Sequence, residues 1–247
     1  MTWIRLRQIA LVARDLAATL DDLHAVFGLE VAFRDPGVAT FGLENAVLPV
    51  GNQFIEVVSP TREGTAGGRQ LDRLGGDGGY MVICHADDLA PIRARAQGLG
   101  IRAALEADDH GYTIWQLHPG DTGGTFLEID FQPGGEDASG PWMPAGPDWQ
   151  RARRTHVVDG ITAVEVRSSD ADKVAARWSE VIGTPVHGGA IALDNATVHI
   201  VPGAAPDALV GITLSMTDRD AALDAARARS LMAADGTITI CGVQFTV

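Results

Sequence analysis

Two glutamates stand at matching places in two similar apolar segments, and their type and spacing are suited to acid–base chemistry. Glu56 lies in the run Phe-Ile-Glu-Val-Val, and Glu128 lies in Phe-Leu-Glu-Ile-Asp. Carboxyl groups gathered in apolar surroundings resist ionisation, so at least one of them has a raised pKa. Such a group can act as a general acid or base near neutral pH. The alternative interpretation is that both are solvent-facing residues of edge strands.

The elements that must position these glutamates belong to a fourfold repeat. In each repeat an alternating apolar strand leads to an Asp that stands seven residues after a reference position. The four segments span residues 8–15, 81–88, 163–170 and 211–218. An Asp at this place can cap a helix, because its carboxylate accepts from the free N–H groups of the first turn. Apolar residues with a period of about 3.6 follow each Asp, which predicts four amphipathic helices.

Short strands separated by turns follow each predicted helix. In the first repeat they cover residues 30–34, 44–50 and 53–59, and in the second residues 102–106, 113–117 and 125–131. The third and fourth repeats are shorter, with last strands at 198–201 and 243–247. Each unit therefore reads as a strand, a helix and three further strands, which predicts an α+β fold built from βαβββ units.

A segment rich in Pro and Gly separates the second unit from the third. It covers residues 133–147 and is followed by the basic run 151–154. This composition is typical of a linker. We therefore predict a first domain at residues 1–133 that carries the site, a linker at 134–157, and a second, degenerate domain at 158–247.

Several of these segments resemble the vicinal oxygen chelate superfamily, which includes glyoxalase I, bleomycin-resistance proteins, extradiol dioxygenases and methylmalonyl-CoA epimerase. Residues 8–16 resemble the family's opening strand, 54–60 its fourth strand, and 78–89 the opening of a second module. The His-Pro turn at 118–124 is similar to that of the epimerase-like branch. The resemblance implies four tandem βαβββ units, paired into two cup-shaped glyoxalase-like domains.

The resemblance also implies a metal site. In that superfamily a divalent metal is held by residues from the first and last strands of paired modules, and the matching positions here are Gln8, Glu56, Met81 and Glu128. Carboxylate and amide oxygens suit a hard cation. Met81 departs from the family's usual His, so we expect it to line the pocket. The predicted ligands are Gln8, Glu56 and Glu128, and the predicted cofactor is a divalent metal (Mg, Mn, Co, Ni or Zn).

The epimerase branch suggests a catalytic pair as well. Glu44 matches the position of a catalytic glutamate there, and Glu128 matches its partner, so both are candidate proton-transfer groups; the alternative for Glu44 is a turn residue. Tyr80, Trp115 and His118 are expected to line the pocket, with core packing as the alternative for the first two and a structural turn for His118.

Two classes of function follow. The first is a metal-assisted isomerase, epimerase or lyase acting on a small carbonyl or carboxylate compound. The alternative is a non-catalytic binding protein of the bleomycin-resistance type, which the loss of a ligand at Met81 favours. Extradiol dioxygenase chemistry is disfavoured because it needs two His and a carboxylate. The C-terminal half has Ala163 and Gly211 at its opening positions, so we expect the pocket within residues 1–132.

Composition limits the partners. The chain of 247 residues has 19 Lys and Arg against 32 Asp and Glu, a net charge of −13 that opposes binding to nucleic acid or anionic membranes. Cys84 and Cys241 lie in apolar runs as expected for reduced thiols, and no signal peptide is evident, so a cytoplasmic location is expected. His85 and His110 are expected in surface loops. A small-molecule ligand and a monomer (an internal pseudo-dimer) or homodimer complete the expectations.

Overall fold

Strands of the first two units form one seven-stranded sheet, sheet A, in the computed structural model, which describes residues 3–247. Its strand order is β2-β3-β1-β4-β7-β6-β5. The strands are β1 (Ile4–Val12), β2 (Leu43–Val50), β3 (Gln53–Pro60), β4 (Gly78–Ala86), β5 (Ala103–Asp109), β6 (Tyr112–Leu117) and β7 (Phe126–Asp130). In each unit the first strand pairs in parallel with the last, and β1 and β4 join the units as an antiparallel pair.

The third and fourth units repeat this arrangement in sheet B, whose order is β13-β14-β12-β8-β11-β10-β9. Its strands are β8 (Val158–Ser168), β9 (Val186–His187), β10 (Ala190–Ala192), β11 (Thr197–Pro202), β12 (Ala208–Met216), β13 (Ile238–Ile240) and β14 (Val243–Thr246). Strand β8 pairs in parallel with β11 and antiparallel with β12, as β1 does with β3 and β4. The predicted fold class, tandem βαβββ units paired into two halves, is confirmed.

Helices follow the opening strands as the repeat predicts. The α-helices are α1 (Leu16–Phe27), α2 (Ala66–Leu74), α3 (Ala90–Gly98), α4 (Pro119–Thr122), α5 (Ala171–Ile182) and α6 (Arg219–Ala228), and the 3₁₀ helices are η1 (Pro36–Phe41), η2 (Met143–Ala145) and η3 (Trp149–Ala152). Asp15 and Asp218 each accept a hydrogen bond from the backbone N–H three residues further on. Asp170 makes no such side-chain bond. Side-chain capping by the predicted Asp therefore occurs in the first and fourth repeats and not in the third.

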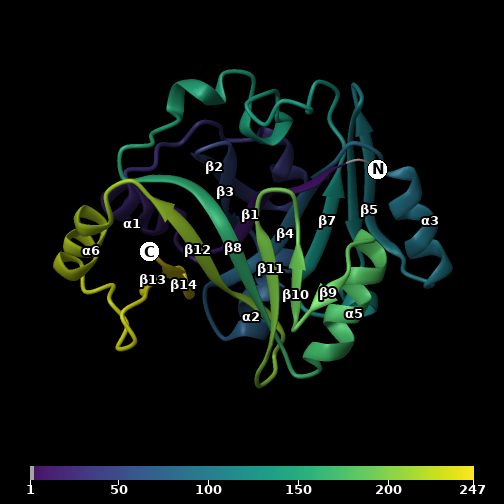
Figure 1. Ribbon diagram of the computed structural model, residues 1–247. Coiled ribbons are helices and arrows are strands. Elements are labelled where there is room, and N and C mark those ends of the chain that lie inside the picture. Colours follow the sequence, from purple (N-terminus) through teal and green to yellow (C-terminus); the bar gives the residue numbers. More distant parts are fainter. Residues whose placement is uncertain (1–2) are drawn as a thin grey trace.

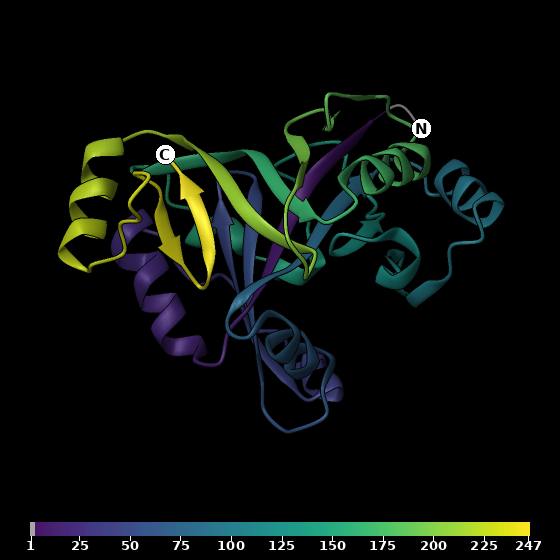
Figure 2. The ribbon, with the colours of Figure 1, turned by 90° about the horizontal axis from the view of Figure 1, so that it is seen from below.

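Two elements differ from the sequence-based expectation. Helix α2 was not among the predicted elements. It begins at Ala66 despite two glycines in its first turn, which lower helix propensity, and is capped by Thr65, whose hydroxyl accepts from the N–H of Gly68. The strand expected at 30–34 is reduced to an isolated bridge between Phe33 and Val47. Helices α2 and η1 project from the side of the molecule opposite sheet B (Figure 2).

The two sheets share one continuous hydrophobic core. One face of sheet A packs toward sheet B, with α1 beside α6 and α3 beside α5, so that the halves lie against each other (Figure 1). Gln53 ties the sheets together, because its amide donates to the carbonyl of Ile161 at 2.9 Å and accepts from its N–H at 2.7 Å. The main core therefore belongs to both halves together.

The other face of sheet A forms the cup, the surface lined by the side chains that point away from sheet B. The segment between the sheets, residues 131–157, arches over one end of this cup along the top of Figure 1. Trp142 and Trp149 of this segment are each only 1% exposed and pack on Phe54. The segment predicted as a linker thus also closes part of the cup.

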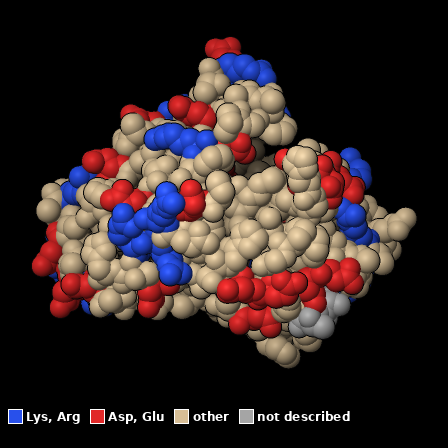
Figure 3. Space-filling view, turned by 90° about the horizontal axis from the view of Figure 1, so that it is seen from above, with Lys and Arg blue, Asp and Glu red and all other residues tan. Residues whose placement is uncertain are grey.

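The surface reflects the composition. Viewed from above, Asp and Glu side chains gather in a broad patch toward the lower right and in smaller groups elsewhere, and Lys and Arg side chains form several separate groups, the largest left of centre (Figure 3). None of the helices within residues 3–247 has the length and apolar character that crossing a bilayer requires.

Candidate functional site

Two β-bulges turn neighbouring side chains of the central strands toward the cup. In the pairing of β1 with β4, Arg7 is an extra residue on β1 and Tyr80 an extra residue on β4. A bulge breaks the strict alternation of faces at the extra residue. Arg7 therefore faces the cup together with Gln8, and Tyr80 together with Met81. The bulges concentrate polar groups at the centre of the sheet.

Gln8 and Glu56 meet on neighbouring strands at the base of the cup. The Nε2 of Gln8 donates to one carboxylate oxygen of Glu56 at 2.9 Å, and the Nδ2 of Asn45 donates to the other at 2.7 Å. The Oε1 of Gln8 accepts from the indole N–H of Trp142 at 2.7 Å. Gln8 is 1% exposed and Glu56 9%. Amide groups thus hold this buried carboxylate from two sides.

Glu128 lies on the same face, across β1 and β4 from Glu56. It is 7% exposed and accepts from the Nε2 of Gln116 at 2.9 Å. The same amide nitrogen lies 3.6 Å from the Sδ of Met81. Since strand side chains alternate between faces, Ile9, Val57 and Ile129, the neighbours of the three polar residues, point into the main core.

Asp130 adds a third carboxyl group two residues along β7. It is fully buried, and one oxygen accepts from the hydroxyl of Tyr112 at 2.5 Å. The other oxygen accepts from the backbone N–H of Trp115 at 3.2 Å. Because residues i and i+2 of a strand share a face, Asp130 and Glu128 sit side by side.

Burial dominates the electrostatics of this group of carboxyls. It raises the pKa of Glu56, against the hydrogen bonds from Asn45 and Gln8, which lower it. Burial also raises the pKa of Glu128 to about 7, with the charge of Glu56 adding to the effect. The pKa of Asp130 lies well above its ordinary value, again through burial and then the charge of Glu128. Burial and the nearby glutamates raise the pKa of Tyr80 to about 12.

Two buried arginines fasten the 131–157 segment over the cup. Arg7 donates to the backbone carbonyls of Asn52 and Ala138 at 2.5 Å each and of Gly140 at 3.3 Å. Arg5 donates to the carbonyls of Gly135 and Glu136. The guanidinium of Arg7 also lies 5.1–5.8 Å from the ring centres of three aromatic side chains, Phe54, Trp142 and Trp149.

His85 corrects one expectation from the sequence. It was placed in a surface loop, but β4 continues to Ala86 and its ring is buried between Trp3 and Trp142. Burial and, to a smaller extent, the charges of Arg5 and Arg7 together lower the pKa of His85 to about 3. This imidazole is neutral at physiological pH. His110, in contrast, is exposed as expected.

Of the residues predicted for the site, the structure brings Gln8, Glu56, Glu128, Met81 and Tyr80 to the cup. Tyr80 packs edge-on against Phe126, another cup residue, with ring centres 5.3 Å apart.

Glu44 and Trp115 are not brought to this group. Glu44 is exposed and lies on the opposite face of β2 from Asn45, since the two are neighbours in one strand. The Trp115 side chain belongs to the main core on the far face of β6, and its neighbour Gln116 faces the cup.

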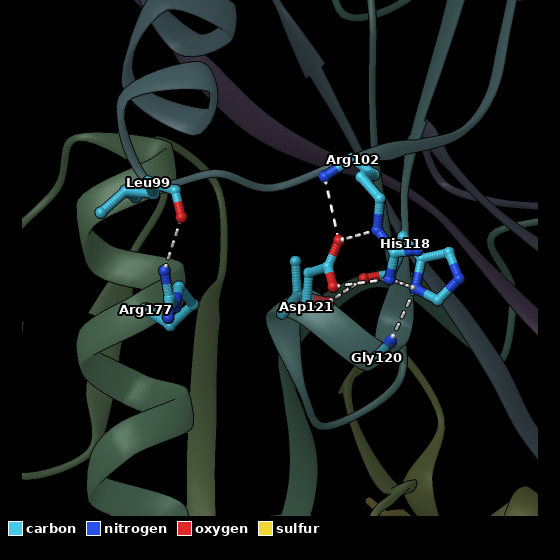
Figure 4. A network of polar contacts seen from close by, with 7 residues as sticks. Leu99, Arg102, His118, Gly120, Asp121 and Arg177 are labelled. Atoms are coloured by element: carbon cyan, nitrogen blue, oxygen red, sulfur yellow. Dashed lines mark hydrogen bonds and ion pairs between the residues drawn. The ribbon is translucent and has the colours of Figure 1, made fainter.

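His118 belongs to a turn network outside the cup (Figure 4). Its Nδ1 accepts from the N–H of Gly120 at 3.1 Å and so caps the short helix α4. Next to it, Arg102 donates from Nε and from one terminal nitrogen to the two carboxylate oxygens of Asp121, at 2.8 Å each. In the same view Arg177 of α5 donates to the carbonyl of Leu99 at 3.3 Å. This cluster fastens α3 and α4 near α5.

Sequence reasoning missed four residues of the site: Asn45, Gln116, Asp130 and Trp142. Asp130 was detectable, because it follows Glu128 by two in the same predicted strand. Gln116 was detectable in part, since it is the polar residue beside the predicted Trp115. No pattern in the sequence connects Trp142 with Gln8, which it reaches from an irregular segment.

The residues present do not fit the divalent metal that the resemblance implies. Both oxygens of Glu56 accept from amides, and the only ligating atom of Gln8, its oxygen, accepts from Trp142. The fourth position holds the thioether of Met81, a poor ligand for a hard cation. Among residues 3–247, no group of three or more His, Cys, Asp or Glu side chains is arranged to hold a metal ion.

Comparison with known proteins places this geometry in a family. A family model described as a glyoxalase-like domain matches residues 9–182, more than half of the chain. No curated protein matches the sequence significantly.

The solved structures include a mutant of 4-hydroxymandelate synthase from Streptomyces coelicolor, with 15% identity over 94% of this chain and 76% of that one, and a TM-score of 0.69. Streptomyces coelicolor methylmalonyl-CoA epimerase in complex with 2-nitronate-propionyl-CoA has 24% identity over 53% of this chain and 99% of that one, with a TM-score of 0.48. The Mycobacterium tuberculosis epimerase has 22% identity over 51% and 86%, with a TM-score of 0.45.

At 15% identity and a TM-score of 0.69, the synthase structure shows a shared fold and leaves the chemistry open. The family match and the two paired βαβββ sheets agree with each other. The chain therefore belongs to the glyoxalase-like domain family of the vicinal oxygen chelate superfamily.

Proposed function

We propose that this protein is an isomerase, epimerase or lyase that moves a proton beside the carbonyl or carboxylate group of a small molecule bound in the cup. The observation that carries the proposal is the placement of Glu128, a nearly buried carboxyl beside Asp130 that is held by one amide donor. A base with a pKa of about 7 is half ionised at neutral pH, so it can both accept and return a proton.

The side chains around Glu128 suit this task. Gln116 donates to one carboxylate oxygen and so fixes the orientation of the group. The neighbouring Asp130 stays protonated at higher pH than an ordinary aspartate, because its pKa is raised. Glu56, held by two amides, keeps a second carboxyl on the same face and helps to keep the pKa of Glu128 high.

Tyr80 can supply the electrophile. Its pKa of about 12 keeps the phenol protonated, and it lies within electrostatic reach of both glutamates. When Glu128 takes the proton from the carbon, the electron pair moves onto the substrate oxygen, and a phenolic O–H is a suitable donor for the resulting oxyanion. Return of a proton to the opposite face of the same carbon, from a second acid, completes an epimerisation, and return to a neighbouring carbon completes an isomerisation.

The accessible part of the cup points to a small, partly apolar ligand. Glu56, Gln116 and Glu128 keep between 7% and 9% of their surface accessible. Around them Met81, Ile114 and Phe126 are half-buried apolar side chains. Sites for small molecules combine apolar walls with a few polar groups that orient the ligand.

Hydrogen–deuterium exchange at carbon tests the proposal directly. The protein is incubated in D₂O with pyruvate, dihydroxyacetone or 2-methylmalonate, and deuterium entry beside the carbonyl is followed by ¹H NMR. We expect exchange well above the buffer rate for at least one compound and a loss of 100-fold or more in Glu128→Gln. Glu165→Gln on the open face of sheet B is the matched control and should exchange at the wild-type rate.

The second candidate function is non-catalytic binding of a small molecule in the same cup. It is favoured by Glu56 and Gln8, whose polar atoms are already engaged by protein donors. No exchange with any of the three compounds, together with ligand-dependent protection against heat, would support this function instead of catalysis.

A further inference from the structure

Two chains of hydrogen bonds end on Glu56, one through Gln8 and one through Asn45. In each chain the group at the other end fixes which way the amide between them donates. An indole N–H can only donate, so Trp142 forces the oxygen of Gln8 to face it and the NH₂ group to face Glu56. A backbone N–H can also only donate, and that of Asp35 bonds the Oδ1 of Asn45 at 2.8 Å. This turns the NH₂ group of Asn45 toward Glu56 as well.

We propose that this protein has a metal-excluding cup, in which the two directed chains from Trp142 and Asp35 place amide N–H groups on Glu56 where family relatives would place a cation. A metal ligand must offer a lone pair, and the side of Gln8 that faces Glu56 offers hydrogen atoms. The amides satisfy the buried carboxylate without a cation, as a buried charge requires.

Trp142 is the positioning residue of this arrangement. Its indole is 1% exposed and held among Phe54, His85 and Tyr112, with ring centres 5.2–6.4 Å away. The packing fixes the N–H in place, so the Gln8 amide has one favourable orientation. Trp149 is a suitable comparison, because it packs on the same Phe54 but its indole donates to the carbonyl of Gly140 at 3.2 Å.

Titration with Mn²⁺, followed by calorimetry and by water-proton relaxation, tests the proposal without any substrate. We expect the wild-type protein and Glu56→Gln to bind Mn²⁺ equally, because any binding that both share belongs to surface carboxylates. Gln8→Glu has nearly the same shape but replaces the NH₂ group by an oxygen, so it should gain at least tenfold in Mn²⁺ affinity. Adding Glu56→Gln to it should abolish the gain.

Trp142→Phe removes the N–H and keeps a ring, which lets the Gln8 amide rotate. We expect at least a threefold gain in Mn²⁺ affinity for this variant and none for Trp149→Phe. Wild-type binding that Glu56→Gln removes would overturn the proposal, and so would a folded Gln8→Glu variant without a gain. Equal behaviour of the two tryptophan variants would overturn the role of Trp142. Deuterium exchange plays no part in these outcomes, so they stand apart from the proposed catalysis.

Discussion

The hydroxyl of Tyr112 donates a 2.5 Å hydrogen bond to Asp130, and both groups are buried on the cup side of sheet A. Tyr112 stands in β6 and Asp130 in β7. Leaving Glu128 aside, the Asp130 carboxyl accepts two hydrogen bonds from residues within 3–247, this one and that of the Trp115 backbone N–H. An acidic side chain at this depth depends on such donors, because it has lost its water.

Tyr112→Phe should therefore destabilise the protein. It leaves one oxygen of Asp130 without its donor, which costs about 1–3 kcal/mol of the free energy of unfolding. Urea denaturation at pH 7 measures the loss. Tyr80→Phe is the matched control. The Tyr80 hydroxyl makes no hydrogen bond to another residue within 3–247, so this variant should lose less of the free energy of unfolding. Equal losses in the two variants would contradict the assignment.

The raised pKa of Glu128 predicts a pH-dependent stability. Folding favours the protonated group, since its pKa rises from 4.5 to about 7. The stabilisation is therefore fully present below pH 4.5 and is lost as the pH rises through 7, by an amount on the order of 3 kcal/mol. Glu128→Gln removes this titration. Urea denaturation should show that the stability of the variant relative to the wild type is higher at pH 8.5 than at pH 5. A stability difference that is the same at both pH values would contradict the prediction.

Arg7 should control the order of the segment above the cup. Arg7→Met removes hydrogen bonds to two backbone carbonyls of this segment, those of Ala138 and Gly140, so amide hydrogen exchange at residues 134–150 should accelerate relative to sheet A. Mass spectrometry of peptic fragments gives the measurement. Arg151→Met, an exposed arginine of the same segment, should leave the exchange unchanged. Faster exchange spread evenly over the chain would show general destabilisation instead.

The ion pair in Figure 4 predicts a local titration. The Arg102 guanidinium and backbone N–H hold the pKa of Asp121 well below its ordinary value. In Arg102→Met, NMR titration of the Asp121 carboxyl should give a pKa closer to that of a free aspartate, because the guanidinium is gone. The pKa of Asp235, which Thr237 lowers at a distant turn, should stay the same and serves as the internal control.

The sequence was sufficient for the fold because its signals are local and repeated. The strand-to-Asp spacing recurs four times, and a period of two decides which side of a strand each residue faces. The same period put Gln8, Glu56 and Glu128 on one surface. These three positions lie within regular strands, where local pattern and final structure agree.

The rest of the site depends on contacts that no local pattern encodes. Trp142 lies 134 residues from Gln8 in the sequence and comes from an irregular segment. The bulge at Tyr80 interrupts the alternation, so its direction follows from strand pairing and not from its own sequence. Glu44 was predicted because it matches the position of a catalytic glutamate in the epimerase branch, yet the register of β2 turns the amide of its neighbour Asn45 toward Glu56.

The shared core between the sheets has a consequence for how the two halves can diverge. In a symmetric homodimer every substitution enters both subunits, so both cups must keep the same residues. Here the two sheets are covalently joined and buried against each other as a dimer's subunits would be. A change in one half leaves the other unaltered. In sheet B the positions that match Gln8 and Met81 are Ala163 and Gly211, so the two halves already differ at the centre of the sheet while their shared core keeps them together.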